Sequence, residues 1–293
     1  MKLSKDLLRI DSEDISLKIV SFIKHRVGVA GAEGVVIGTS GGLDSSTLAI
    51  LCAEALGPEK TLCLILPEQS SPTSSNVEDA LSLCEKFNLQ YEIIEISPIL
   101  ASVKKACSGL NLENEKIVFG NIKARTRMMI LYAYANTLSR LVVGTGNKSE
   151  IATGYFTKYG DGGVDILPIG DLYKTQVRQL AKALDVPEKI MEKSPSAGLW
   201  PGQTDEEELG ISYDQLDLIL YGLEFWMLLE EIAEQLKISL EKVKNIEKKI
   251  HITEHKRRGS IILKLGYRTF GLDWRVPLDQ PINIRKNGGA YFG

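Results

Sequence analysis

The sequence predicts an α/β fold: a doubly wound, mainly parallel sheet with helices on both faces, followed by a helical C-terminal part. In roughly the first 200 residues, short apolar runs alternate with stretches of helical spacing. This alternation is typical of parallel strands covered on both faces. In the last third, residues 205–257 keep helical spacing with few Gly or Pro.

The predicted elements follow in order along the chain. The first is an amphipathic helix over 15–27, whose apolar side carries Ile15, Ile19, Phe22, Ile23 and Val27. A strand at 34–39 leads through a polar turn into a helix at 45–56, which Gly57-Pro58 ends. The remaining elements of this half are strands at 61–66, 91–96 and 141–144 and a long helix at 121–140.

Composition bounds the class of protein. The 293 residues carry a net charge of −3, so charge gives no reason to expect binding to nucleic acid or to an anionic membrane. The N-terminal residues lack the apolar core of a signal peptide, and no apolar stretch approaches the roughly 20 residues that span a bilayer. The four cysteines form no C-x-x-C pair, and we expect reduced, buried thiols in a cytoplasmic protein.

We expect one domain over residues 1–258, because no linker rich in Pro or Ser interrupts it. Residues 259–293 form a tail of Gly, Pro, Arg and aromatic residues without clear periodicity. This tail is either docked on the domain or partly disordered.

The first strand enters the segment SGGLDSS, which starts at Ser40. A strand, a Gly-rich turn and a helix expose backbone N–H groups at a helix start, where they bind phosphate. The carboxylate of Asp44 would repel a bare phosphate there, but it could hold Mg²⁺ that bridges to phosphate oxygens. The alternative is a tight strand-to-helix turn in which Ser and Asp only cap the helix. The segment is neither a Walker A loop nor G-x-G-x-x-G.

With its preceding strand, SGGLDSS resembles the pyrophosphate loop of the ATP pyrophosphatases, which split ATP between the α and β phosphates. Further motifs resemble ammonia-dependent NAD synthetase over about residues 15–258. In order they are GNIKARTRMM (120–129), GTGNKSE (144–150), GYFTKYGDGGVD (154–165), YKTQVRQLA (173–181), SPSAGL (194–199) and TEHKRR (253–258). This family adenylates the nicotinate carboxylate of deamido-NAD, and ammonia then displaces AMP to give NAD.

The resemblance implies an ATP and metal site. The ATP-binding residues would be Gly38, Thr39, Ser40, Gly41, Gly42, Leu43, Asp44, Ser45, Thr145, Lys174 and Ser196. Lys174 would neutralise charge on the departing pyrophosphate, and Ser196 stands where the family more often has Thr. Glu150 could add a second carboxylate to Mg²⁺ on Asp44, although alone it would be taken for a helix cap. The chain has Gly146-Asn147 where the bacterial sequences have Asp-His, so the roles of those family side chains are not carried over, whereas those of Thr145 and Glu150 are.

The resemblance also implies a site for deamido-NAD, formed by Arg125, Lys158, Asp165, His255 and Lys256. Arg127 lies about 200° around the helix from Arg125 and is expected to be structural. The loop KYGDGG would fold over the substrate, with Asp161 near the incoming ammonia. The alternatives are a plain surface turn for the loop and a solvated helix end for His255 and Lys256.

The family also implies a homodimer. Its glutamine-dependent relatives carry an additional N-terminal amidase domain, for which about 40 residues before the opening turn leave no room, so we expect free ammonia or a separate subunit to supply nitrogen. Two rivals remain: another ATP pyrophosphatase, such as a tRNA thiolation enzyme, and a nucleotide-binding module without catalysis.

Overall fold

The computed structural model describes residues 1–68, 74–110, 115–200 and 202–275. Its centre is a parallel sheet with strand order β3-β2-β1-β4. The strands are β1 (Gly34–Gly38), β2 (Thr61–Ile65), β3 (Gln90–Ile93) and β4 (Arg140–Val143). Each lies within a few residues of its predicted position, so the sequence pattern located the sheet correctly.

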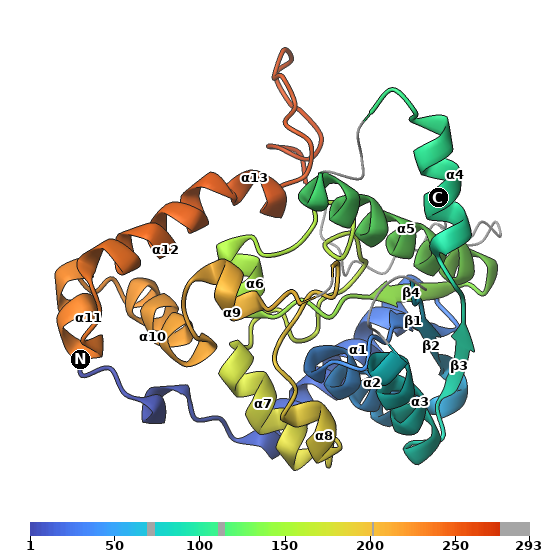
Figure 1. Cartoon of the computed structure of the whole chain (residues 1–293), viewed down its shortest axis with the longest axis horizontal. Helices are drawn as coiled ribbons and strands as arrows, with labels where there is room; N and C mark the ends of the chain where they lie inside the picture. Colours follow the sequence, from blue (N-terminus) through green and yellow to red (C-terminus); the bar gives the residue numbers. More distant parts are fainter. Residues whose placement is uncertain (69–73, 111–114, 201, 276–293) are drawn as a thin grey trace.

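Helices cover both faces of the sheet (Figure 1). Side chains alternate along β1: Val35 and Ile37 pack into one hydrophobic cluster, whereas Val36 packs into another on the opposite face. The first face is covered by α1 (Ser12–Ala30), α2 (Leu43–Leu56), α3 (Ser74–Lys86) and α7 (Lys174–Ala183). The second face is covered by α4 (Ser97–Ala106) and α5 (Lys116–Thr137). The predicted doubly wound fold is confirmed.

The helical part has a hydrophobic cluster of its own, built mainly from α10, α11 and α12 and the N-terminal residues Leu3 and Leu8. In Figure 1 it lies beside the sheet, and α6 and α7 stand between the two. Its helices are α9 (Asp205–Leu209), α10 (Tyr213–Glu224), α11 (Leu229–Leu236), α12 (Leu240–Ile252) and α13 (Glu254–Arg257). The short elements are η1 (Lys5–Leu8), η2 (Pro58–Lys60), α6 (Lys148–Thr153) and α8 (Glu188–Met191).

Two details of the sequence prediction need comment. Phe22, assigned to the apolar side of the first helix, is exposed, whereas Ile19, Ile23 and Val27 are buried. Of the four cysteines, only Cys107 is not fully buried, and it follows α4 rather than lying within it. Among the described residues, no helix is long and apolar enough to cross a membrane.

The tail continues from α13 without a named helix or strand as far as residue 275. Its apolar side chains are largely exposed, Ile261 at 94% and Tyr267 at 91%. Residues 276–293 lie outside the described residues. The domain boundary at 258 stays a prediction.

Candidate active site

The opening turn joins the end of β1 to the start of α2. The Ser45 hydroxyl accepts a hydrogen bond from the Ser40 backbone N–H at 3.2 Å and donates one to the Gly42 carbonyl at 3.1 Å. Gly41 has φ +71°, and a Cβ built there would lie 2.2 Å from the backbone oxygen of Asn76. Only glycine fits this position, because both the conformation and the space exclude a side chain. The hydroxyl of the buried Ser46 has no hydrogen-bond partner among the described residues.

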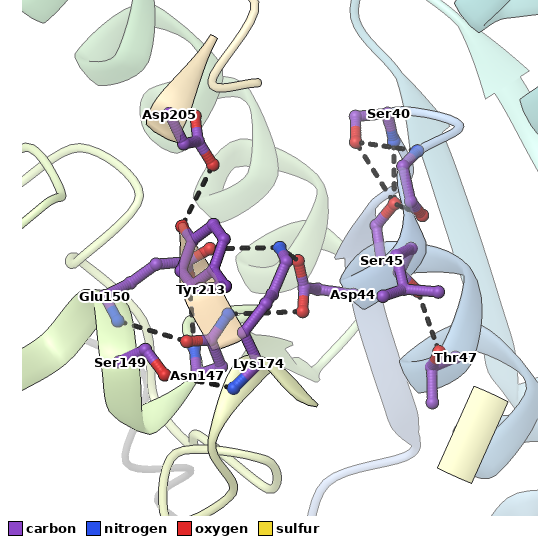
Figure 2. Close-up of polar contacts among 12 residues, drawn as sticks. Ser40, Asp44, Ser45, Thr47, Asn147, Ser149, Glu150, Lys174, Asp205 and Tyr213 are labelled. Atoms are coloured by element: carbon purple, nitrogen blue, oxygen red, sulfur yellow. Dashed lines mark hydrogen bonds and ion pairs between the residues drawn. The ribbon is translucent and has the colours of Figure 1, made fainter. Parts of the chain in front are cut away.

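Three charged groups meet beside this turn (Figure 2). The Lys174 Nζ donates a short hydrogen bond to the Asp44 Oδ2 and lies 3.4 Å from the Glu150 Oε1. The Lys174 side chain is 4% exposed, and the two carboxylate side chains are 15% and 17% exposed. The structure thus brings together the three residues to which the sequence assigned metal and phosphate chemistry.

Two helix starts place Glu150 and Lys174. Glu150 lies in the first turn of α6, where Asn147 and Glu150 form a capping box. The Asn147 Nδ2 also donates to the Asp44 Oδ1 at 3.2 Å, so this side chain joins the first carboxylate to the helix of the second. Lys174 is the first residue of α7. The departure from the bacterial pattern gave no basis for a role of Asn147, but in the structure this side chain caps α6 and contacts Asp44.

Burial raises the pKa of the Glu150 carboxyl to about 8, a rise that Lys174 opposes and Asp44 increases. The Asp44 and Glu150 carboxylates raise the pKa of the Lys174 ammonium, against the effect of burial. Lys174 therefore stays charged at neutral pH. The carboxyl group of Glu150 is largely protonated at that pH, because its pKa lies above 7.

This arrangement predicts how Glu150 contributes to stability. Its folded-state pKa of about 8 lies above the ordinary value of 4.5, so its contribution is present below pH 4.5 and is lost as pH rises through 8. Glutamine does not titrate, so the Glu150→Gln variant does not lose stability at this position as the pH rises. We expect the free energy of unfolding of Glu150→Gln, relative to the unsubstituted protein, to rise between pH 5 and pH 8. Urea denaturation at both pH values without ATP or Mg²⁺ measures it, and a difference independent of pH would contradict the prediction.

The donors present fit Mg²⁺. The carboxylates of Asp44 and Glu150 reach the same ammonium group, so one metal ion near that position would be within reach of both. Mg²⁺ usually takes one or two protein carboxylates and completes its shell with phosphate and water oxygens. Among the described residues, no cluster of three or more His, Cys, Asp or Glu side chains could hold a metal ion.

A second group of predicted residues lies along α5. The loop after α6 follows this helix: Gly160 lies against Ala124, Gly163 against Met128, and Asp165 accepts a hydrogen bond from Tyr132 at 3.0 Å. These α5 residues are four apart and share one face. The loop from 157 to 165 is therefore held in register with α5.

Arg125, Lys158 and His255 are brought together on this side. The Arg125 guanidinium donates to the Lys158 carbonyl at 3.3 Å, and the Lys158 Nζ donates to the His255 carbonyl at 2.6 Å. Both cations therefore bind backbone oxygens. The sequence separation of these residues exceeds 30 in each case.

Lys256, Asp161 and Asp165 have different surroundings. The Lys256 Nζ donates to the carbonyls of Gly154 and Phe156 at 2.7 and 2.8 Å. Asp161 reaches solvent, yet the surrounding protein raises its pKa by removing hydration, while its Oδ1 accepts from the Thr157 N–H at 2.8 Å. The Asp165 Oδ2 accepts from the Val142 N–H of β4 at 2.7 Å.

Two further residues complete the predicted ATP set. Thr145 leaves β4 beside the opening turn, since Ile37 of β1 pairs with Val143 of β4. Ser196 is exposed, and its Oγ accepts from the Gly198 N–H at 3.1 Å. The residues just before it are anchored, because the Asp205 N–H donates to the Pro195 carbonyl at 3.0 Å and the Lys193 Nζ binds Asp79.

Arg127 was expected to be structural. Its Nε donates to the Leu66 carbonyl at 3.1 Å, at the end of β2. Burial lowers the pKa of Arg127, and Glu68 and Asp161 oppose that change. The guanidinium thus lies between the end of a strand and the loop of Asp161.

The fold and the site define a nucleotide-dependent ligase of the adenine nucleotide alpha hydrolase-like class. The chain belongs to the NAD synthase family, whose sequence model matches residues 15–260. It is 53% identical to the NH(3)-dependent NAD(+) synthetase of Archaeoglobus fulgidus over 212 residues, which cover 72% of this chain and 84% of that one. It is 50% identical to the NH(3)-dependent NAD(+) synthetase of Thermococcus kodakarensis over 241 residues, 82% and 92% of the two chains.

Solved structures are similar as well. The NMN synthetase of Francisella tularensis superposes with a TM-score of 0.78 at 37% identity. The match covers 88% of this chain and 100% of that chain. The NH3-dependent NAD synthetase of Campylobacter jejuni, in complex with the nitrate ion, gives a TM-score of 0.74 at 34% identity and covers 87% and 100% of the two chains.

Proposed function

We propose that this chain forms NAD from deamido-NAD, ATP and ammonia through a deamido-NAD adenylate, releasing AMP and pyrophosphate. The observation that carries the proposal is the contact of Lys174 with Asp44 and Glu150 beside the Gly-rich turn of a NAD synthase family member. A tRNA thiolation enzyme fits less well, because the relatives are NAD synthetases.

In the first step, the opening turn (38–45), Thr145, Lys174 and Ser196 bind the ATP phosphates. The nicotinate carboxylate of deamido-NAD attacks the α-phosphorus, and pyrophosphate leaves. The Lys174 ammonium neutralises the charge that develops on the leaving group. A Mg²⁺ ion held by Asp44 and Glu150 would neutralise further phosphate charge.

In the second step, ammonia attacks the mixed anhydride, and the amide and AMP form. Arg125, Lys158, Asp165, His255 and Lys256 hold deamido-NAD, so that positioning supplies much of the rate. In this proposal Asp161 orients ammonium or accepts its proton. Because the surroundings raise its pKa, Asp161 is a stronger base than an ordinary carboxylate.

The proposal includes a homodimer in the cytoplasm. Exposed apolar side chains on α5, among them Met129, offer a surface for a second copy. ATP as substrate and the free cysteines fit a reducing compartment. Sedimentation of the purified protein tests the dimer.

A product assay tests the reaction. Purified protein is mixed with deamido-NAD, Mg-ATP and ammonium, and the products are separated by chromatography. NAD with equal amounts of AMP and pyrophosphate supports the proposal. AMP formed only when nicotinate mononucleotide replaces deamido-NAD would show a mononucleotide substrate instead. ATP binding without any AMP would favour a binding module.

Asp161→Asn separates the two steps. We expect the variant to keep adenylation, measured as pyrophosphate release in the first turnover, and to lose about 10²-fold in the rate of NAD formation at low ammonium. The reason is that Asn cannot accept a proton from ammonium. Equal loss in both steps would contradict this role for Asp161.

A further inference from the structure

Helix α10 contacts both sequence neighbours of Lys174, and it contacts the residue that precedes Glu150. The contacting side chains are Tyr213, Asp217 and Glu224, which recur at intervals of four and seven and therefore lie on one stripe of the helix. Lys174 Nζ lies 5.3 Å from the centre of the Tyr213 ring. Glu224 accepts hydrogen bonds from the Tyr173 hydroxyl at 2.5 Å and from the Lys148 Nζ at 3.0 Å.

Asp217 is the centre of this stripe and is fully buried, with 0% exposure. Its Oδ1 accepts from the Ser149 hydroxyl at 2.5 Å. Its Oδ2 accepts from both the backbone N–H and the hydroxyl of Thr175, at 2.8 and 2.7 Å. Both carboxylate oxygens are therefore engaged, and both partners are direct sequence neighbours of the site residues.

A third bond closes the connection. The Ser149 Oγ accepts from the Lys174 backbone N–H at 3.0 Å, as Figure 2 shows. The first turns of α6 and α7 are thus joined directly and also through one carboxylate on α10. Burial raises the pKa of Asp217, and the bonds from Ser149 and Thr175 oppose that rise. Burying a carboxylate costs free energy of folding unless its hydrogen bonds are kept.

We infer that Asp217 is a positioning residue for ATP: it fixes the separation of Glu150 and Lys174 by holding Ser149 and Thr175. This inference rests on the proposed function of that pair. Asp217 touches neither the phosphates nor the metal ion. It sets where the two charged side chains start, in the way that outer hydrogen bonds orient metal ligands.

Asp217→Asn tests the inference, because Asn keeps the size but replaces one acceptor with a donor. Calorimetry should show Mg-ATP binding weakened by about 10- to 100-fold. Affinity for deamido-NAD should change by less than about twofold, since the proposed deamido-NAD residues are not among the hydrogen-bond partners of Asp217. kcat/KM for ATP should fall with the ATP affinity.

Asp214→Asn is the matched control. Asp214 lies on the same helix, but it is partly exposed and pairs with Lys5 on the surface. The same chemical change there should leave Mg-ATP binding unchanged, because exposed ion pairs contribute little.

Ser149→Ala is the second test and is needed if Asp217→Asn does not fold. It removes the hydroxyl that joins Asp217 to the Lys174 N–H, and it should weaken Mg-ATP binding in the same selective way. Mg-ATP affinity within twofold of the unsubstituted protein in the folded variants would overturn the inference. Equal loss of ATP and deamido-NAD affinity with a lowered Tm would overturn it too. That result is expected if Asp217 only stabilises the start of a helix and thereby the fold as a whole. Absence of NAD formation by the unsubstituted protein would instead refute the proposed function, and ATP binding would still test Asp217.

Discussion

Lys174→Met is expected to lower kcat/KM for ATP by about 10²- to 10³-fold. Methionine keeps most of the length and apolar surface of the lysine but removes the charge that neutralises the departing pyrophosphate. It also leaves the carboxylates of Asp44 and Glu150 without the ammonium that joins them. We expect the protein to fold, because Glu150 already has a raised pKa and can remain protonated.

Lys182→Met is the control, since Lys182 is exposed near the end of the same helix. Initial rates of AMP formation at varied ATP measure the effect, and circular dichroism checks the fold. Wild-type kcat/KM for ATP in the Lys174→Met variant would show that Lys174 has no role in the adenylation step.

Gly41→Ala should have an effect of similar size by a different cause. The new Cβ would meet the Asn76 backbone oxygen at 2.2 Å, and alanine would have to adopt φ +71°. Such a conformation costs about 1–3 kcal/mol before the clash is counted. The turn must therefore move, and we expect the affinity for ATP to fall by about 10²-fold.

Gly28→Ala provides the comparison. Gly28 lies within α1, and a Cβ there has no neighbour within 4 Å. This change should leave ATP affinity intact and raise stability by about 0.5–1 kcal/mol. Calorimetric titration with ATP compares both variants, and full affinity in Gly41→Ala would show that the turn tolerates a side chain.

The sheet was predictable because its signals are local. Val35, Val36 and Ile37 are buried on alternating faces, and a run of apolar residues reports that directly. The order of the strands is not local: it depends on contacts between residues far apart. Phe22 illustrates the limit, because helical spacing places it near the apolar side but cannot show which neighbours cover it.

The site was predictable where a motif names the residue. Asp44, Glu150 and Lys174 were chosen from three separate motifs, and the structure places them in contact. Asp217 could not be chosen, because an aspartate within an amphipathic helix has no signal that separates it from a solvated one. Its role follows only from two partners that lie 42 and 68 residues away.

Helix α7 belongs to two hydrophobic clusters at once. Tyr173, at its N-terminal cap, packs in the cluster of the helical part, whereas Val177, one turn later, packs against the sheet. The helical part therefore cannot be exchanged independently of the sheet and the helices that cover it. A chimaera that joined this sheet to the helices of a relative would need to inherit Tyr173 and its partners from one parent, and a crossover within α7 would separate them.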